Sequence, residues 1–544
     1  MRSTMQDAPL SIARLVRHGT VVHGASEVSS WTGDGFRTAT YADVGKRAAR
    51  LANALRALGI DGDQRVATYQ WNNQEHLEAY FAVPAMGAVL HTLNIRLFPE
   101  QVVYIANHAE DKVVIVDASL VEPLSEVLAE FETVEHVMVT GEDPDLSPLA
   151  DKGAEIHSYE SLLADASDDF DWVEVDENDA AAMCYTSGTT GNPKGVVYSH
   201  RSVVLHSMAA CMGDAMGLSP SSKVLVIVPQ FHAMAWGLPY AAMLVGAELV
   251  MPDRFLQPEP MLKMIQEAKP NFAGAVPTIW QGLLGLLEGD DEADISCLEE
   301  VVVGGSACPE SLMRAFEEKF RVRILHAWGM TETSPLGSVA RPPIAAHGED
   351  AWRYRVTQGR FMAGVEARLI AEDGSVQPWD DEAVGELECR GPWITASYHL
   401  DDDDDEKFHD GWLRTGDVGR VSRDGFLTLT DRSKDVIKSG GEWISSVELE
   451  NAIMSHPAVA EAAVVGIPDE KWGERPLASV VVKDGEDVSA ADLRGFLADK
   501  VAKWQLPDSW TFIEEVPKTS VGKFDKKVIR QRFADEELEV VQAS

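Results

Sequence analysis

The sequence predicts an α/β protein in which a large N-terminal domain of doubly wound sheets precedes a smaller α+β C-terminal domain. Two observations carry this prediction. The chain has 544 residues, which is more than one hydrophobic core ordinarily serves. Before about residue 340, short apolar runs alternate with segments of helical periodicity. Such alternation is typical of parallel sheets with helices on both faces.

The periodicity also locates single elements in this first part. Residues 40–55 carry apolar side chains at helical spacing, which predicts a helix. Compact apolar runs predict buried strands at 65–70, 112–117, 180–184, 223–229 and 298–303.

The pattern changes after residue 359. Short alternating runs such as 385–390 are separated by Gly and Asp, which indicates a small antiparallel or barrel-like section up to residue 430. Beyond it, a helix is expected over 446–453 and strands at 461–466 and 478–482. These elements predict a compact tail of roughly one hundred residues.

Composition narrows the function classes. The formal net charge of −41 argues against a nucleic-acid partner, because the phosphate backbone would be repelled. No long uncharged apolar run predicts a membrane span. Five scattered cysteines without CxxC pairing fit a reducing cytoplasm and argue against structural zinc. The six acids at 401–406 are typical of a solvated loop. The acidity fits either salt adaptation or a highly soluble protein of ordinary habitat.

Residues 185–195 combine glycines, hydroxyl side chains and one lysine directly after an expected strand. Backbone N–H groups freed by glycine, hydroxyl donors and a mobile ammonium suit a polyphosphate. The segment does not fit the Walker A pattern, and a plain surface loop remains the alternative. The phosphate-binding candidates are Thr186, Ser187, Gly188, Thr189, Thr190, Gly191 and Lys194.

Further motifs follow this loop in order, at 229–232, 328–332, 415–417, 431–441 and 517–526. Together they resemble the signature motifs of the adenylate-forming superfamily, which contains acyl-CoA synthetases, carrier-protein adenylation domains and beetle luciferases. The resemblance covers residues 40 to 530. Within the superfamily, residues 106–109 and 438–445 are most similar to medium- and long-chain fatty acyl-CoA synthetases and their relatives that act on short acids.

The resemblance implies that the protein uses ATP, Mg²⁺ and coenzyme A. Glu332 and the Thr186 hydroxyl would hold Mg²⁺, and the alternative for Glu332 is an ordinary acid at a helix start. Trp328 stands where most relatives have tyrosine, and its ring would stack on adenine beside Gly329 and Thr331. The resemblance also implies that the backbone of Gly305, Ser306 and Ala307 contacts the nucleotide. Asp417 and Arg432 would contact its ribose. An ordinary strand-to-helix turn is the alternative at 304–307.

The same resemblance divides the chain into an N-terminal adenylation domain (1–431), a hinge (432–435, with Lys434 at the pivot) and a mobile C-terminal domain (436–544). Lys523 would act on the carboxylate and the α-phosphate, whereas the neighbouring Lys518, Lys526 and Lys527 are expected at the surface. After rotation, Lys438, Gly440 and Gly441 would face the site for thioester formation. Trp443 would either gate the adenine side or pack in the domain core. A homodimer is expected.

The acid substrate is expected to bind near His232, Trp236, Val303, Gly304 and Met330. The family places an aromatic gate at the position of His232, so we expect a gate and not a general base; a structural histidine is the alternative. Trp236 follows four residues later, and a helix there would put both side chains on one face. The tryptophan would fill space that a long acyl chain needs.

The chain is also similar, in overall texture and acidity, to bacterial 3-methylmercaptopropionate–CoA ligases. This likeness implies 3-methylmercaptopropionate as a substrate. C4–C8 fatty acids are expected as well, because Trp236 would restrict the pocket to short or medium chains and a thioether is close to a methylene in size and apolar character. The alternatives are a long-chain fatty acyl-CoA synthetase, an enzyme that loads a carrier protein, and a relative that binds without turnover.

Overall fold

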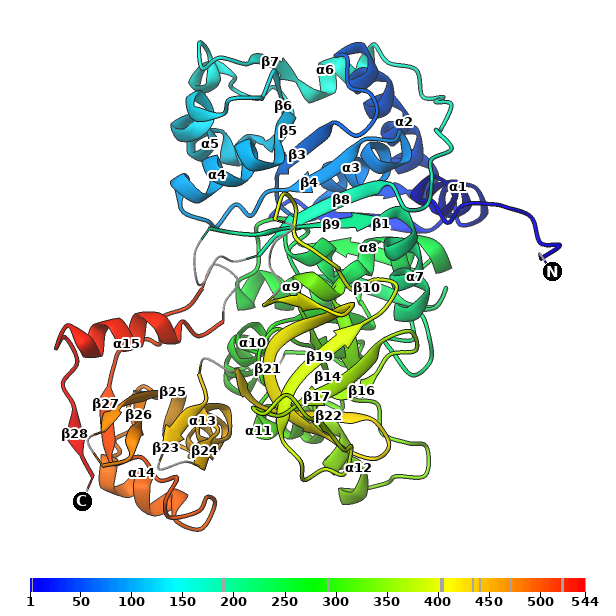
Figure 1. Cartoon of the computed structure of the whole chain (residues 1–544). Coiled ribbons are helices and arrows are strands. Elements are labelled where there is room, and N and C mark those ends of the chain that lie inside the picture. Colours follow the sequence, from blue (N-terminus) through cyan, green and yellow to red (C-terminus); the bar gives the residue numbers. More distant parts are fainter. Residues whose placement is uncertain are drawn as a thin grey trace.

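The fold is taken from a computed structural model. It describes residues 1–544 except 2, 187–191, 291–292, 402–405, 433–434, 440–441, 470, 520–522 and 544. The side chains of residues 442 and 443 are also outside the description. The chain runs from two stacked sheets to a smaller C-terminal body beside them (Figure 1).

The first sheet is parallel except at one edge, where β8 and β9 form an antiparallel hairpin. Its strands run, in spatial order, β7 (Glu155–Ser158), β6 (His136–Thr140), β5 (Asp111–Asp117), β3 (Arg65–Tyr69), β4 (Val89–Thr92), β8 (Ala180–Tyr185) and β9 (Gly195–Ser199). Sequential strands joined through helices in one direction are what the strand–helix alternation predicts.

The second sheet has a parallel part with an antiparallel strand at its far edge. That part runs β14 (Arg323–Gly329), β13 (Glu300–Val303), β12 (Phe272–Ala275), β10 (Lys223–Val226), β11 (Glu248–Met251), β1 (Glu27–Trp31) and β2 (Phe36–Thr40).

The section after residue 359 is antiparallel, as expected, but it extends the second sheet instead of standing apart from it. The strand before it, β15 (Leu336–Val339), pairs with β14 on one side and with β16, the first strand of the section, on the other, so the hydrogen-bonded ladder continues without a break. The strands of the section are β16 (Gly359–Phe361), β17 (Glu366–Ile370), β18 (Val376–Gln377), β19 (Gly385–Arg390), β20 (Phe408–His409), β21 (Trp412–Val421) and β22 (Phe426–Arg432).

Helices cover both sheets and fill the space between them. One apolar core joins residues of the two sheets through α2, α3 and α8, while α4 and α5 pack on the outer face of the first sheet and α9 to α11 on that of the second. The helices are α1 (Ile12–Val22), α2 (Tyr41–Ala57), α3 (Gln74–Ala85), α4 (Pro99–Ala109), α5 (Val121–Val127), α6 (Tyr159–Ala164), α7 (His200–Ala210), α8 (Leu238–Val245), α9 (Pro258–Ala268), α10 (Pro277–Gly289), α11 (Glu310–Ala315) and α12 (Glu349–Arg355).

The C-terminal body has its own sheet and its own apolar core. Three helices accompany the sheet: α13 (Ser446–Met454), α14 (Ala490–Leu497) and α15 (Lys526–Ala534). The strands run β24 (Glu442–Ile444), β23 (Ile437–Ser439), β26 (Gly473–Val482), β27 (Ser509–Phe512) and β28 (Val541–Gln542), with β25 (Val459–Asp469) on the other side of β26. The fold therefore has the predicted large sheet domain and smaller C-terminal domain.

Several expected elements are close to the observed ones. The helix predicted at 40–55 is α2, whose N-cap is Thr40 with a reciprocal hydrogen bond to Asp43. The strand predicted at 223–229 ends earlier, at Val226. No helix in the described part of the chain is both long and apolar enough to cross a bilayer.

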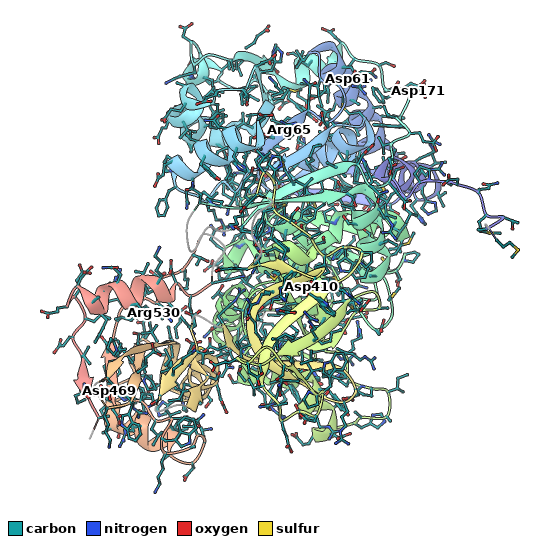
Figure 2. All side chains as sticks on the ribbon, in the orientation of Figure 1. Asp61, Arg65, Asp171, Asp410, Asp469 and Arg530 are labelled. Carbon is teal, nitrogen blue, oxygen red and sulfur yellow. The ribbon has the colours of Figure 1, made fainter. Side chains whose placement is uncertain are left out.

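Charged side chains are spread over both domains, as the composition requires. Figure 2 shows Asp61 and Asp171 on the N-terminal domain and Asp469 and Arg530 on the C-terminal one. Many of these charges are paired; Arg530, for example, contacts Asp435 at 2.6 Å.

Candidate active site

A cavity of about 1000 Å³ lies where the two domains meet. The loops that follow β12, β13 and β14 open into it, because the carboxyl ends of parallel strands share one edge of the sheet. The predicted residues that line this cavity are Thr186, Lys194, His232, Trp236, Gly304, Gly305, Ser306, Ala307, Trp328, Gly329, Met330, Thr331, Glu332, Asp417, Arg432 and Lys523.

The neck of the expected phosphate loop closes the β8–β9 hairpin. The Thr186 N–H donates to the Lys194 carbonyl at 2.9 Å, and the Lys194 N–H donates to the Thr186 hydroxyl at 3.0 Å. The Lys194 ammonium is 3.0 Å from Asp401 and 4.8 Å from the ring centroid of Tyr398. Ser187, Gly188, Thr189, Thr190 and Gly191 lie outside the described residues.

Glu332 presents a buried carboxylate to the cavity. It lies in a short 3₁₀ turn, Thr331–Thr333, after β14, so it is also an acid at a helix start. Its side chain is buried, and the Tyr398 hydroxyl donates to Oε1 at 2.6 Å. Gly329 lets the chain make this turn, because a Cβ there would lie 1.9 Å from the Pro335 carbonyl oxygen. An oxygen donor held in this way fits a hard cation such as Mg²⁺.

Asp417 connects three elements of the site. It lies on β21 opposite Arg432 of β22, and Arg432 Nε is 2.7 Å from Asp417 Oδ1. The indole Nε1–H of Trp328 donates to Asp417 Oδ2 at 2.8 Å. The Asp417 carboxylate, more than any other group, raises the pKa of Arg432.

Lys523 enters the cavity from the C-terminal domain. Its Cε would lie 3.5 Å from a Cβ on Gly305, which has a φ of +83°. Burial and then Arg432 lower the pKa of Lys523 to about 8, while Asp417 and Glu332 oppose the shift. The ammonium is therefore held among the candidate groups for nucleotide and metal binding, which suits charge stabilisation at a phosphoryl centre.

His232 and Trp236 both line the cavity, although the segment between them is not the α-helix that would have placed both side chains on one face. Ala233 to Trp236 all have positive φ, between 41° and 56°, and form a left-handed turn. The cost of this backbone for L-residues must be offset by the packing of a fully buried segment. The Trp236 ring lies against Gly304 and Gly274, 3.6 and 3.7 Å from where their Cβ atoms would be.

The protonation state of His232 follows from its surroundings. Burial, with the nearby cations Lys523 and Arg96, lowers its pKa to about 3. The ring is then neutral at pH 7, and a base this weak is poorly matched to proton abstraction.

Comparison with known proteins now decides the family. The AMP-binding enzyme family matches residues 20–399, and the C-terminal domain of AMP-binding enzymes matches residues 448–523. The chain belongs to the AMP-binding enzyme family.

Known members resemble this AMP-binding enzyme along almost its whole length. The 3-methylmercaptopropionyl-CoA ligase of Ruegeria lacuscaerulensis is 43% identical over 98% of this chain and 99% of its own. The long-chain-fatty-acid–CoA ligase of Thermus thermophilus is 44% identical over 98% of this chain and 97% of its own. The crystal structure of an anthranilate CoA ligase bound to anthranoyl-AMP superposes with a TM-score of 0.87 at 25% identity, over 98% of this chain and 100% of that one.

Two predicted residues of this AMP-binding enzyme lie away from the main cavity. Val303 points to the opposite face of β13, into the core beside α10 and α11, and Val302 lines the cavity instead. Successive residues of a strand face opposite sides, so the prediction was wrong by one residue. Lys438 is exposed and lies 3.3 Å from Glu372 of the N-terminal domain. Gly440 and Gly441 are outside the described residues, as is the side chain of Trp443.

Sequence reasoning missed three features of the site. Tyr398 has no signal of its own, because its role depends on the fold bringing it to Glu332. Arg96, in the loop after β4, lies 5.9 Å from the Phe231 ring centroid and close enough to His232 to lower its pKa. Lys526 was expected at the surface but is largely buried, 2.8 Å from Glu450.

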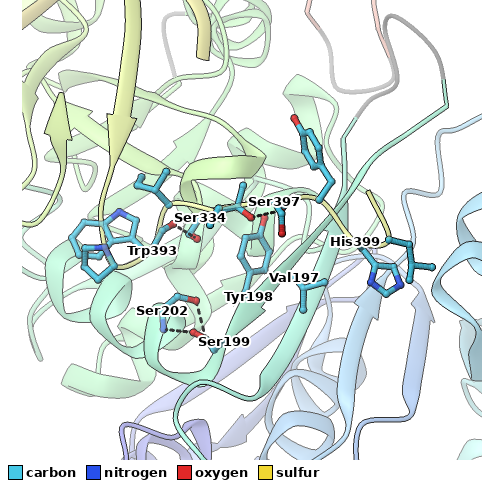
Figure 3. A pocket seen from close by; sticks show the side chains of 14 residues that line it. Val197, Tyr198, Ser199, Ser202, Ser334, Trp393, Ser397 and His399 are labelled. Carbon is cyan, nitrogen blue, oxygen red and sulfur yellow. Dashed lines mark hydrogen bonds between the residues drawn. The ribbon is translucent and has the colours of Figure 1, made fainter. Parts of the chain in front are cut away.

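A second hollow, of about 430 Å³, is lined mainly by residues 392–400, the segment that also brings Tyr398 to the main cavity. Figure 3 shows Tyr198 between Ser334 and Ser397, with His399 at one end and Trp393 at the other. The Tyr198 hydroxyl donates to the Thr331 carbonyl at 2.8 Å, so this wall supports the turn that carries Glu332.

Proposed function

We propose that the protein is an AMP-forming acid–CoA ligase. It would couple a carboxylic acid to the AMP part of ATP with release of pyrophosphate, and then transfer the acyl group from this acyl-adenylate to the thiol of coenzyme A with release of AMP. One observation carries the proposal. Lys523 of the C-terminal domain meets Asp417, Arg432 and Glu332 in one cavity whose rim holds the neck of a phosphate-type loop. A carboxylate attacks an anionic phosphorus only when both partners are aligned and the phosphoryl charge is compensated.

The residues divide this work. Lys194 and the segment from Thr186 would hold the leaving phosphates, Trp328 would support adenine, and Asp417 with Arg432 would hold the ribose. Glu332 and Thr186 would hold Mg²⁺, which neutralises phosphate charge when bound. Lys523 would neutralise charge on the reacting oxygens, since an ammonium on a flexible stem can follow a moving charge.

Thioester formation would need a second arrangement of the domains. We propose a hinge at 432–435 between an N-terminal domain of 1–431 and a C-terminal domain of 436–544. Rotation about it would bring Lys438, Gly440 and Gly441 to the cavity. The outward position of Lys438 beside Glu372 supports this proposal, because that lysine lies at the domain surface while Lys523 lies in the cavity.

We further propose 3-methylmercaptopropionate and C4–C8 fatty acids as substrates. The Ruegeria relative supports the first, whereas the Thermus relative favours long chains. Trp236 supports the short acids, because its ring lies against Gly274 and Gly304 and takes up room at the acyl end of the cavity. A thioether and a methylene are alike in size and polarity, so the pocket would separate them by about tenfold to a few hundredfold at most.

The test is AMP release measured over a panel of acids, with and without CoA. We expect CoA-dependent release of AMP and an equal amount of thioester with 3-methylmercaptopropionate and butyrate. Adenylate formation without any thioester from free CoA would favour the enzyme that loads a carrier protein. If no acid in the panel led to release of AMP, the remaining alternative would be a relative that binds its ligands without turnover. We also propose that the protein is a cytoplasmic homodimer. The five free thiols support the compartment. Measurement of the molecular mass by analytical ultracentrifugation tests the dimer.

A further inference from the structure

Three side chains of types that can coordinate a metal come together at the edge of the first sheet, and none of them lines the cavity. His136 begins β6, and Glu155 and His157 lie on the edge strand β7. In the parallel register, His136 is opposite Glu155 and Met138 is opposite His157. Alternate residues of a strand share a face, so all three side chains project on the same side of the sheet.

Their ligand atoms are close enough to share one ion. His136 Nδ1 is 3.2 Å from His157 Nε2 and 3.7 Å from Glu155 Oε2, and all three ligand atoms lie within 4.8 Å of one another. Zinc bonds to nitrogen and oxygen of about 2.0–2.2 Å place tetrahedral ligand atoms roughly 3.3–3.5 Å apart. The two distances from His136 are therefore close to the spacing that a bound ion imposes, and the Glu155 and His157 ligand atoms lie within 4.8 Å of each other.

The environment also suits a cation with an open coordination position. The His136 side chain is 16% exposed and that of Glu155 is 70% exposed, so the cluster is anchored on one side and reaches solvent on the other. Glu135, the residue before His136, is paired with Lys112 at 2.8 Å, so these two charges largely cancel. The Glu155 carboxylate would then supply the net charge of the site.

We propose that His136, Glu155 and His157 bind a divalent transition-metal ion of the zinc class, with water completing the coordination. Two imidazoles and one carboxylate favour zinc, nickel or cobalt over Mg²⁺, which prefers oxygen ligands throughout. The ion would bridge β6 and β7 and hold the edge strand in place, so it would stabilise the N-terminal domain without taking part in the reaction.

Calorimetric titration of the chelator-treated full chain with Zn²⁺, after removal of any histidine tag, tests the site. We expect one tight site per chain, and at least a tenfold loss of affinity in His157→Ala and in Glu155→Gln. His18→Ala is the matched control, because His18 and His23 form another histidine pair, with ring centroids 5.1 Å apart, that lacks the clustered carboxylate. Glu332→Gln is the control for binding of Zn²⁺ by the carboxylate in the main cavity. Both controls should bind as the wild type does.

Thermal unfolding supplies a second readout. Zn²⁺ should raise the melting temperature of the wild type and of both controls but not that of Glu155→Gln, which alters an exposed side chain and should fold normally. Mg²⁺ at the same concentration should leave the melting temperature of the wild type unchanged. Unaltered Zn²⁺ affinity in both His157→Ala and Glu155→Gln, or no Zn²⁺ uptake by the wild type, would overturn the proposal.

Discussion

The indole N–H of Trp328 donates a hydrogen bond of 2.8 Å to Asp417, whose other carboxylate oxygen pairs with Arg432 at 2.7 Å. The ring proposed to lie under adenine is thus fixed by the carboxylate proposed to hold the ribose. Tyrosine, the usual residue of the superfamily at this position, has no N–H in that place on its ring. The tryptophan therefore does more than enlarge the stacking surface.

Replacement of Trp328 by phenylalanine should weaken ATP use more than acid use. The change keeps an aromatic face but removes one donor from a buried carboxylate, a loss of about 1–3 kcal/mol. We expect kcat/KM for ATP to fall roughly tenfold to a hundredfold. The KM for the acid should stay near its original value. Trp472→Phe, at an exposed tryptophan, serves as the control, and an equal loss in both variants would contradict the prediction.

The adenylation rate should fall as pH rises through the pKa of Lys523. Burial and Arg432 lower that pKa to about 8, and the proposed role needs the charged form. kcat/KM for ATP should therefore be level on the acid side of pH 8 and decrease on the alkaline side, because it reports the free enzyme. Lys523→Arg should lack this decrease, since guanidinium stays protonated. A wild-type profile that stays level up to about pH 9.5 would exclude the assignment.

Lys438 should matter only after the adenylate has formed. It lies outside the main cavity beside Glu372, so Lys438→Ala leaves the described arrangement of the cavity intact. Pyrophosphate release in a single turnover should match the wild type, and thioester formation from supplied acyl-AMP should fall at least tenfold, or by about 1.4 kcal/mol. Glu372→Ala is the control for loss of the ion pair alone. Slower adenylation in Lys438→Ala would count against the second arrangement.

Trp236→Gly should shift the preferred acid toward longer chains. Glycine accepts the left-handed backbone of this turn, so the change removes the indole without adding strain. Each methylene that enters the vacated space is worth about 0.8 kcal/mol, close to fourfold in kcat/KM. Hexanoate and octanoate should gain on butyrate in the variant. The pocket assignment fails if palmitate already exceeds butyrate in the wild type.

The sequence was sufficient for the class of fold and for a group of candidate residues that share the cavity. Strand–helix alternation predicts the parallel sheets, and α2 begins at the residue after Thr40 because its capping residues are local signals. Asp417, Arg432 and Lys523 could be named because they stand in motifs that the superfamily shares. The face to which the Val303 side chain points could not be predicted, because β13 ends in three consecutive valines and a short apolar run shows no alternation that would tell one face from the other.

Features that depend on tertiary contacts were beyond reach. The left-handed turn at Ala233–Trp236 is built from residues that ordinarily avoid positive φ, so composition points away from it. Tyr398 reaches Glu332 from a segment 66 positions later in the chain. Lys526 resembles any surface lysine until the fold places Glu450 beside it.

The most direct test of the account separates the two half-reactions in Lys523→Ala. Pyrophosphate release from ATP and acid should fall by about 10²–10³, the usual cost of one preorganised charge contact. Thioester formation from supplied acyl-AMP and CoA should stay within a few-fold of the wild type. Lys527→Ala, at an exposed lysine of α15 four positions later in the chain, should leave both rates unchanged. Equal impairment of the two half-reactions in Lys523→Ala would contradict the role assigned to this lysine and, with it, the proposed mechanism.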